Sequence, residues 1–224
     1  MRPAAVMFYR LPRPKPPART LWGALLSALS AGEIPAAFAD ERTWRGTLYV
    51  SRWINSDLAE LPTNAIGGKL SFRDTSFAGV GITKVIVPGF DVTLPILNHT
   101  FANNSIELEG QALHHFGQEH HVEGAASILW RTGNVSLLSG ASMNFGFGIG
   151  GSYAFAKPKV EGVGFVRPRR YLNYLVVETE LSHRDLPWTH LVLRVHHRSG
   201  IFGLIAPKHS GSNYIGVGLR FDLP

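Results

Sequence analysis

Apolar and polar residues alternate with period two along most of the chain after residue 40, the pattern of β-strands with two different faces. Several of these strands exceed the ~5–6 residues usual in soluble sheets and match the ~9–11 residues of a tilted membrane-spanning strand. The pattern therefore predicts an all-β fold, an eight-stranded antiparallel up-and-down transmembrane β-barrel. The predicted strands cover residues 46–56, 78–88, 105–115, 119–130, 143–156, 171–183, 188–200 and 212–222.

Two segments show the difference between the faces most clearly. Residues 144–150 place aromatic or branched side chains on one face and glycine on the other, and residues 215–221 repeat this pattern with Arg220 among the glycines. A narrow eight-stranded barrel needs small side chains pointing inward. We therefore expect the apolar face to point outward, toward lipid.

A soluble barrel of the lipocalin kind would have the opposite polarity, so the charged residues on the other face decide the orientation. Buried arginines would be costly inside an apolar ligand cavity, whereas in a polar lumen they can pair with carboxylates. The cations concerned are Arg194, His196, Arg198 and Arg220, and the predicted partners are Glu107, Glu109, Glu123, Glu178 and Glu180. This favours a membrane barrel, with a soluble periplasmic binding protein as the alternative.

The connections follow if both barrel ends lie in the periplasm, as is usual for such barrels. The turn at residues 184–187 is then short and periplasmic, and residues 201–211 form a longer extracellular loop. Residues 57–77 are predicted to be another extracellular loop. Residues 89–104 are too long for a periplasmic turn, and the alternation does not explain them.

The N-terminal segment has the order of features of a signal peptide. Residues 1–20 are basic and rich in proline, and the apolar run at residues 21–29 is too short to span a bilayer, which needs ~20 residues. A small-x-small cleavage site follows at Ala37-Phe38-Ala39. We predict a signal peptide over residues 1–39 and an outer-membrane β-barrel domain over residues 40–224, located in the bacterial outer membrane. The alternative is an unstructured tail ahead of a soluble domain.

Charge and composition exclude several other functions. The net charge is +6, but five basic residues and Glu33 belong to the signal segment, so the remaining chain carries about +2. This removes the argument for a nucleic-acid partner. The chain has no Cys and therefore no disulfide or thiolate chemistry. Phosphate-loop and dinucleotide motifs do not occur, and we predict no cofactor.

His197 and Ser199 are the candidate catalytic residues. Residues two apart on a strand share a face, and these two share theirs with Leu191, Leu193 and Val195, the face assigned to lipid. A His and a Ser at the outer rim of that face are hard to explain by packing. The alternative is that the strand simply becomes polar as it leaves the membrane.

Two further groups of residues could bind ligands. The segment His114–His121 forms the tip of the predicted third hairpin, and histidines facing each other across a hairpin can bind zinc. Because neighbouring residues point to opposite faces, at most two would converge from each set, and a polar rim with lumen-facing histidines is the preferred interpretation, without a metal. The basic run Arg167–Arg170 either binds phosphates or is solvated.

The C-terminal quarter resembles a known family. The sequence His197-Arg198-Ser199, a loop of about ten residues, and Gly211 to Phe221 are similar to the outer-membrane lipid A 3-O-deacylases of the PagL type, also called acyloxyacyl hydrolase-like. The resemblance implies a Ser-His-Glu triad on the outer surface of an eight-stranded barrel. It implies hydrolysis of the ester at the 3 position of lipid A, so that lipid A, or lipopolysaccharide in the outer leaflet, would be the partner.

Carried over by position, Ser199 would be the nucleophile and His197 the general base. The chain departs from the family in two places. Gly200 stands where Asn is usual, although its backbone N–H could serve an oxyanion. No acidic residue lies between Ser199 and Asp222, so Asn213 is the predicted substitute for the triad Glu. A non-catalytic barrel of the same fold, with a structural, adhesion or lipid-binding role, is the alternative, and a homodimer is left open.

Overall fold

The computed structural model describes residues 43–94, 96, 98–161, 168–207 and 210–224. The predicted signal peptide at residues 1–39 lies outside these ranges, as does Arg167 of the basic run.

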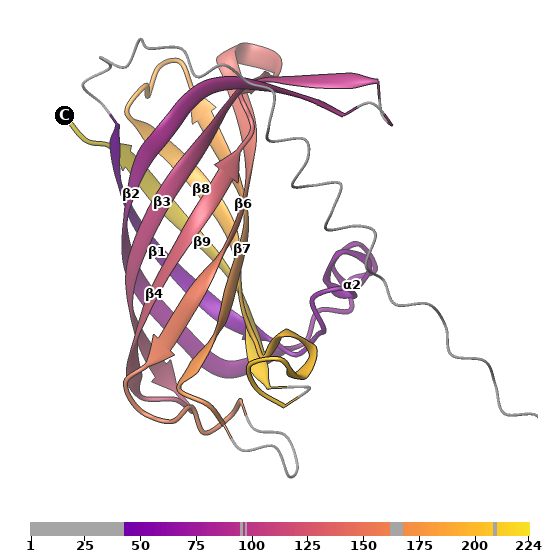
Figure 1. The fold of residues 1–224 in the computed structure, drawn as a ribbon, viewed down its shortest axis with the longest axis vertical. Coiled ribbons are helices and arrows are strands. Elements are labelled where there is room, and N and C mark those ends of the chain that lie inside the picture. Colours follow the sequence, from indigo (N-terminus) through magenta and orange to yellow (C-terminus); the bar gives the residue numbers. More distant parts are fainter. Residues whose placement is uncertain (1–42, 95, 97, 162–167, 208–209) are drawn as a thin grey trace, which may run out of the picture. The chain divides into compact units, whose positions relative to one another are not determined.

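Nine antiparallel strands form the described part of the chain (Figure 1). Eight of them close into a ring, because β1 pairs with both β2 and β9 and because β4 pairs with β6. The two-residue strand β5 adds only a short edge to β6. The strands are β1 (Trp44–Ile54), β2 (Phe72–Leu94), β3 (His99–Gly117), β4 (His121–Arg131), β5 (Val135–Ser136), β6 (Ala141–Ala154), β7 (Tyr171–His183), β8 (Thr189–Ser199) and β9 (Gly211–Asp222).

The helical segments of the described residues are short. They are α2 (Leu61–Ile66), η3 (Leu138–Gly140) and η4 (Ile201–Gly203). None of them is long and apolar enough to cross a membrane.

The predicted all-β, eight-stranded antiparallel barrel is confirmed, and most strands begin and end within a few residues of their predicted bounds. The two exceptions are β2, predicted at 78–88, and β3, predicted at 105–115, both of which are much longer. Register shifts between Val85 and Val92 interrupt the alternation there, although the pairing continues to Leu94. Bulges of this kind hide a strand from a period-two pattern because each one inserts an extra residue.

Within the unexplained segment 89–104, residues 89–94 and 99–104 are therefore the end of the β2–β3 ribbon, which runs past the end of the barrel (Figure 1). At the opposite end of β2, residues 72–77 belong to the strand. The predicted loop 57–77 was accordingly wrong in its bounds, and the connection between β1 and β2 covers residues 55–71 and contains α2.

The outer face of the barrel is apolar. We call the end where β1 begins and β9 ends the terminal end, and the opposite end, which carries the β1–β2, β3–β4, β6–β7 and β8–β9 connections, the loop end. Exposed aliphatic and phenylalanine side chains cover the middle, with exposed Trp44 and Trp188 at the terminal end and Tyr153 and Tyr171 at the loop end. An apolar band between two aromatic belts is what a bilayer requires.

The lumen is filled with side chains, and glycine makes room for them. A Cβ atom added at Gly148 would lie 2.7 Å from the Leu129 Cγ atom, and one added at Gly216 would lie 1.9 Å from the Ser51 Oγ atom. Both distances are shorter than van der Waals contact. The glycine-lined inner face predicted from residues 144–150 and 215–221 is therefore needed for closure.

Charged side chains fill the terminal half of the lumen and pair as predicted. Glu178 accepts hydrogen bonds from Arg194 and Arg220, both at 2.8 Å, and from Arg131. Arg194 also donates to Glu109 at 2.6 Å. All of these groups are buried.

The loop half of the lumen has a different composition. Glu123 lies 3.0 Å from His115 and 3.1 Å from His196. Arg198 donates to Glu161 at 2.5 Å, and Glu161 comes from the β6–β7 connection, which returns into the lumen. Aromatic rings separate the two halves, since Phe77 packs on the histidines of the loop half while Tyr49 packs on Phe77 and on Arg194.

Candidate active site

His197 and Asn213 form the centre of the candidate site. They are paired across β8 and β9 near the loop end, on the outer face of the barrel. His197 is partly exposed, and Asn213 is 9% exposed. The Nδ1 atom of His197 lies 2.5 Å from the Oδ1 atom of Asn213. The sequence-predicted substitute for the missing triad acid is therefore in hydrogen-bond contact with the predicted base.

The Asn213 amide determines which tautomer the histidine adopts. The Nδ2 atom of Asn213 donates to the backbone carbonyl of Ser56 at 2.6 Å, which assigns the amide nitrogen to that side and the oxygen to His197. An amide oxygen can only accept, so His197 donates from Nδ1. In the neutral ring the lone pair is then on Nε2, as a general base acting through Nε2 requires.

Ser199 lies on the same face of β8, two residues beyond His197, and pairs with Gly211. Ser199 is partly exposed, like His197, while Arg198 between them is buried, so the predicted outward orientation of both residues agrees with the structure. Within the described residues, no hydrogen bond joins Ser199 to His197. Catalytic hydrogen bonds often form only when substrate is bound.

The residues after Ser199 form a compact turn. The carbonyl of Gly200 accepts from the N–H groups of Ile205 and Ala206, at 2.9 and 3.3 Å. A Cβ atom at residue 200 would lie 2.4 Å from the carbonyl oxygen of Ala206. Gly200 therefore permits this close approach, and its N–H remains the predicted oxyanion donor.

Asp57 is a site residue that the sequence reasoning missed. It follows Ser56, whose carbonyl holds Asn213, and its carboxylate is within electrostatic reach of the His197 ring. Ile54, the last β1 residue, pairs with Asn213 and is only 1% exposed, so the chain is buried where β1 leads into the loop that holds Ser56 and Asp57. The available signal was topological, since strand β1 must pair with the last strand in a closed barrel and therefore brings its following loop to Asn213.

An apolar depression of about 450 Å³ lies on the outer face beside the site. Its lining includes Ile215, the outward-facing residue next to Asn213 on β9, and Leu193, the second outward-facing residue from His197 on β8. A second depression of about 670 Å³ shares Val50 and Val217 with it, so the two are continuous. An apolar surface of this kind suits an acyl chain lying against the barrel.

The two other sequence-predicted groups lie elsewhere. In the hairpin, His115 and His121 are buried in the lumen while His114 and His120 point out, so two of the four histidines converge, as expected. In the basic run, Arg169 and Arg170 are exposed at the loop end. Their role in phosphate binding stays a prediction.

The fold and the outer surface together define the class of protein, an outer-membrane type of β-barrel. No family model matches the sequence, and no curated protein matches it either.

Among solved structures, the chain is similar to the crystal structure of the outer membrane enzyme PagL. The TM-score is 0.54 at 7% sequence identity, and the match covers 80% of this chain and 99% of that one. It also matches the N-terminal β-barrel domain of Pseudomonas aeruginosa OprF, with a TM-score of 0.44, 9% identity and coverage of 81% and 98%. The match to the crystal structure of Neisserial surface protein A has a TM-score of 0.42 at 10% sequence identity and covers 81% of this chain and 97% of that one. At these identities the likeness concerns the fold, and the predicted outer-membrane location agrees with it.

Proposed function

We propose that this chain is an outer-membrane esterase that removes the 3-O-linked acyl chain from lipid A, with Ser199 as nucleophile and His197 as general base. One observation carries the proposal. A histidine on a lipid-facing surface is held in the tautomer needed for base catalysis by Asn213, which is itself held by the carbonyl of Ser56. A strand end that is merely solvated does not need such an arrangement.

The reaction follows from these groups. The Nε2 atom of His197 takes the proton of the Ser199 hydroxyl as Oγ attacks the ester carbonyl, and an oxyanion forms. Collapse of this intermediate breaks the bond to the sugar oxygen, which takes the proton from His197. Water, deprotonated by the same ring, then attacks the acyl-enzyme. The bond to Oγ of Ser199 breaks as Oγ takes the proton back from His197, which releases a 3-hydroxy fatty acid and restores the Ser199 hydroxyl and the neutral ring.

The imidazolium that forms in both steps needs compensation that a neutral amide cannot give. In the proposal, Asn213 orients the ring, and the Asp57 carboxylate, within electrostatic reach, stabilises its positive charge. The two functions that one triad carboxylate usually combines are then divided between two residues. Because Asp57 is exposed to solvent, its contribution is screened and modest.

The apolar depressions beside the site support an acyl substrate. They extend from Ile215 toward the middle of the barrel along the face that contacts lipid. A lipid A acyl chain in the outer leaflet would lie along this surface with its ester near Ser199, so that the substrate need not leave the membrane.

A non-catalytic barrel of the same fold is the second candidate. The absence of a hydrogen bond between Ser199 and His197 in the described residues favours it, as does the amide in place of the triad carboxylate. The mass spectrum of lipid A from cells that express the protein separates the two functions. The esterase removes one 3-hydroxyacyl group from lipid A, whereas the non-catalytic barrel leaves lipid A unchanged although it is correctly inserted.

Three variants test the assigned roles. Ser199→Ala is expected to abolish deacylation without preventing insertion, while the exposed serine variant Ser136→Ala keeps full activity. Asn213→Ala is expected to lower the rate by about 10²–10⁴-fold, the range that general base catalysis contributes. Asp57→Asn should lower it by about tenfold or less, in line with an exposed charge. Full activity of Ser199→Ala would remove the nucleophile assignment.

A further inference from the structure

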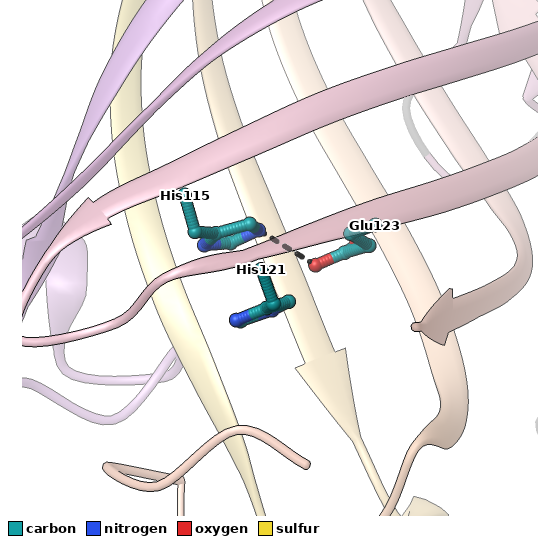
Figure 2. A group of neighbouring side chains, drawn as sticks. All are labelled: His115, His121 and Glu123. Atoms are coloured by element: carbon teal, nitrogen blue, oxygen red, sulfur yellow. Dashed lines mark hydrogen bonds and ion pairs between the residues drawn. The ribbon is translucent and has the colours of Figure 1, made fainter. Parts of the chain in front are cut away.

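Three side chains in the loop half of the lumen converge on one point (Figure 2). They are His115 from β3 and His121 and Glu123 from β4, and one ligand atom of each lies within 4.8 Å of the others. The imidazole rings of His115 and His121 are stacked, with centroids 4.2 Å apart. All three residues are at least nine-tenths buried.

His121 is buried without satisfying its ring nitrogens. Within the described part of the chain, the Nε2 atom has no hydrogen-bond partner, and the nearest acceptor to Nδ1 is the Glu119 carboxylate at 3.5 Å, too far for a normal hydrogen bond. Leaving a buried polar group unpaired costs free energy. Stacking on His115 does not remove that cost. The described residues leave these nitrogens without a hydrogen bond, so a bound ligand could supply the missing partner.

The charges around the cluster point to a cation. The buried charged side chains of this half are the carboxylates of Glu119, Glu123 and Glu161 and the guanidinium of Arg198. Arg198 is engaged mainly by Glu161, at 2.5 Å, and lies 3.7 Å from Glu123. With neutral histidines and ionised carboxylates, two negative charges are left without a counter-charge, which is the charge of one divalent ion.

We propose that the loop half of the lumen binds one zinc ion, or a chemically similar divalent transition metal, through His115, His121 and Glu123. Two imidazoles and one carboxylate form a ligand set that zinc accepts in proteins. Imidazole nitrogen selects against Mg²⁺ and Ca²⁺, which prefer oxygen ligands.

The site needs only side-chain movement to close. Tetrahedral ligands at bond lengths of about 2.1 Å lie about 3.4 Å apart, whereas the three ligand atoms lie within 4.8 Å of one another, so they must approach by up to about 1.4 Å. Glu119, near His121, or a water molecule would complete the coordination. The metal would join the two strands of the β3–β4 hairpin and stabilise the loop end of the barrel.

Metal content of the mature barrel, folded in detergent without a histidine tag, tests this proposal without reference to esterase activity. The protein is stripped with a chelator, incubated with ZnCl₂, washed, and analysed by elemental mass spectrometry. We expect one zinc per barrel and a thermal unfolding midpoint that rises with zinc concentration. Failure of the esterase proposal would leave this result unaffected.

The matched variants are His121→Gln and His120→Gln, neighbours that point into the lumen and away from it. Among the described residues, the only polar contact of the His121 ring is the 3.5 Å approach of Nδ1 to Glu119, so its replacement should not prevent folding. We expect His121→Gln to lose the zinc and His120→Gln to retain it. Wild-type protein holding no more zinc than His121→Gln, or equal loss in His120→Gln, would overturn the proposal. If His121→Gln does not fold, the wild-type barrel is titrated with Co²⁺ instead. Four-coordinate Co²⁺ gives intense visible absorption bands, and their absence would reject the site.

Discussion

The two halves of the lumen contain the same kinds of residues in different balance. In the terminal half, four arginines face four glutamates in a connected network; they are Arg45, Arg131, Arg194 and Arg220 with Glu107, Glu109, Glu178 and Glu180. In the loop half, Arg198 is the only buried arginine among the described residues, and it faces three buried glutamates and three buried histidines. Several side-chain nitrogens and oxygens there have no hydrogen-bond partner. The residues are Glu119, Glu123 and Glu161 with His115, His121 and His196.

This difference separates a structural region from one that is incomplete by itself. Buried ion pairs that are fully hydrogen-bonded hold strands in register, because removal of one partner leaves an uncompensated charge. The terminal half comes close to that description, because its arginines and glutamates balance in number. Only Arg45 Nε and Arg220 Nη2 lack a hydrogen bond among its buried guanidinium nitrogens in the described residues, and each lies within ion-pair distance of a carboxylate, at 3.3 and 3.7 Å. The loop half retains surplus negative charge and imidazole nitrogens without hydrogen bonds, on His121 and His196, as a binding site would. Four substitutions test this contrast, in order of decreasing effect.

Glu178→Gln should cause the largest loss of stability. Glu178 contacts Arg131, Arg194 and Arg220, and the isosteric amide would leave three guanidinium groups with too little negative charge. We expect the free energy of unfolding to fall by about 3–5 kcal/mol, measured by urea unfolding in detergent micelles. A loss below about 1 kcal/mol would mean that this network is not the structural part of the lumen.

Glu123→Gln, the corresponding change in the loop half, should cost less. It weakens the contacts to His115 and His196, but it also removes one of the surplus negative charges. We expect a loss of about 1–3 kcal/mol in metal-free protein, by the same unfolding measurement. If this variant were as destabilised as Glu178→Gln, the two halves would not differ in the way described.

Glu161→Gln should have a small effect at neutral pH and a distinct effect on pH dependence. Burial raises the pKa of the Glu161 carboxyl, against the opposing influence of Arg198. The folded state therefore binds a proton more readily than the unfolded chain. Stability falls as pH rises from the ordinary glutamate pKa through the raised pKa, and it is regained as pH falls through that window.

The glutamine variant keeps an oxygen that can accept from Arg198 and Ser212, so its stability at neutral pH should change by no more than about 1 kcal/mol. Unfolding curves of wild type and variant across this pH window check the sign. An unchanged difference between them at every pH would contradict it.

Arg184→Gln provides the lower limit of the series. The side chains of Arg184 and its partner Asp185 are 77% and 73% exposed, outside the lumen, in the β7–β8 turn. We expect a change within about 0.5 kcal/mol. A larger effect in the same unfolding assay would show that charge in general, rather than burial, determines the losses in the other variants.

Much of the barrel could be predicted because period-two alternation records burial directly. It placed His197 and Ser199 outside and Arg194 inside, and the structure agrees. The long ribbon of β2 and β3 could not be predicted, since the register shifts between Val85 and Val92 break the alternation while pairing continues.

The remaining site residues depend on contacts that local pattern does not encode. Asp57 comes within electrostatic reach of His197 only because β1 closes the ring against β9. Glu161 belongs to the β6–β7 connection and not to a strand, yet it turns into the lumen to meet Arg198. In both cases the role of a loop residue depends on a tertiary contact with a distant strand, which hydrophobic periodicity does not indicate.

The hydrogen bond from Asn213 to the Ser56 carbonyl crosses the seam where the first and last strands meet. In the proposed enzyme, the base is therefore oriented only after the whole polypeptide has been delivered and the cylinder has shut. A chain that is incomplete or not yet inserted would contain the serine and the histidine without this alignment, so it would not hydrolyse lipid esters. Closure of the barrel would itself activate the enzyme.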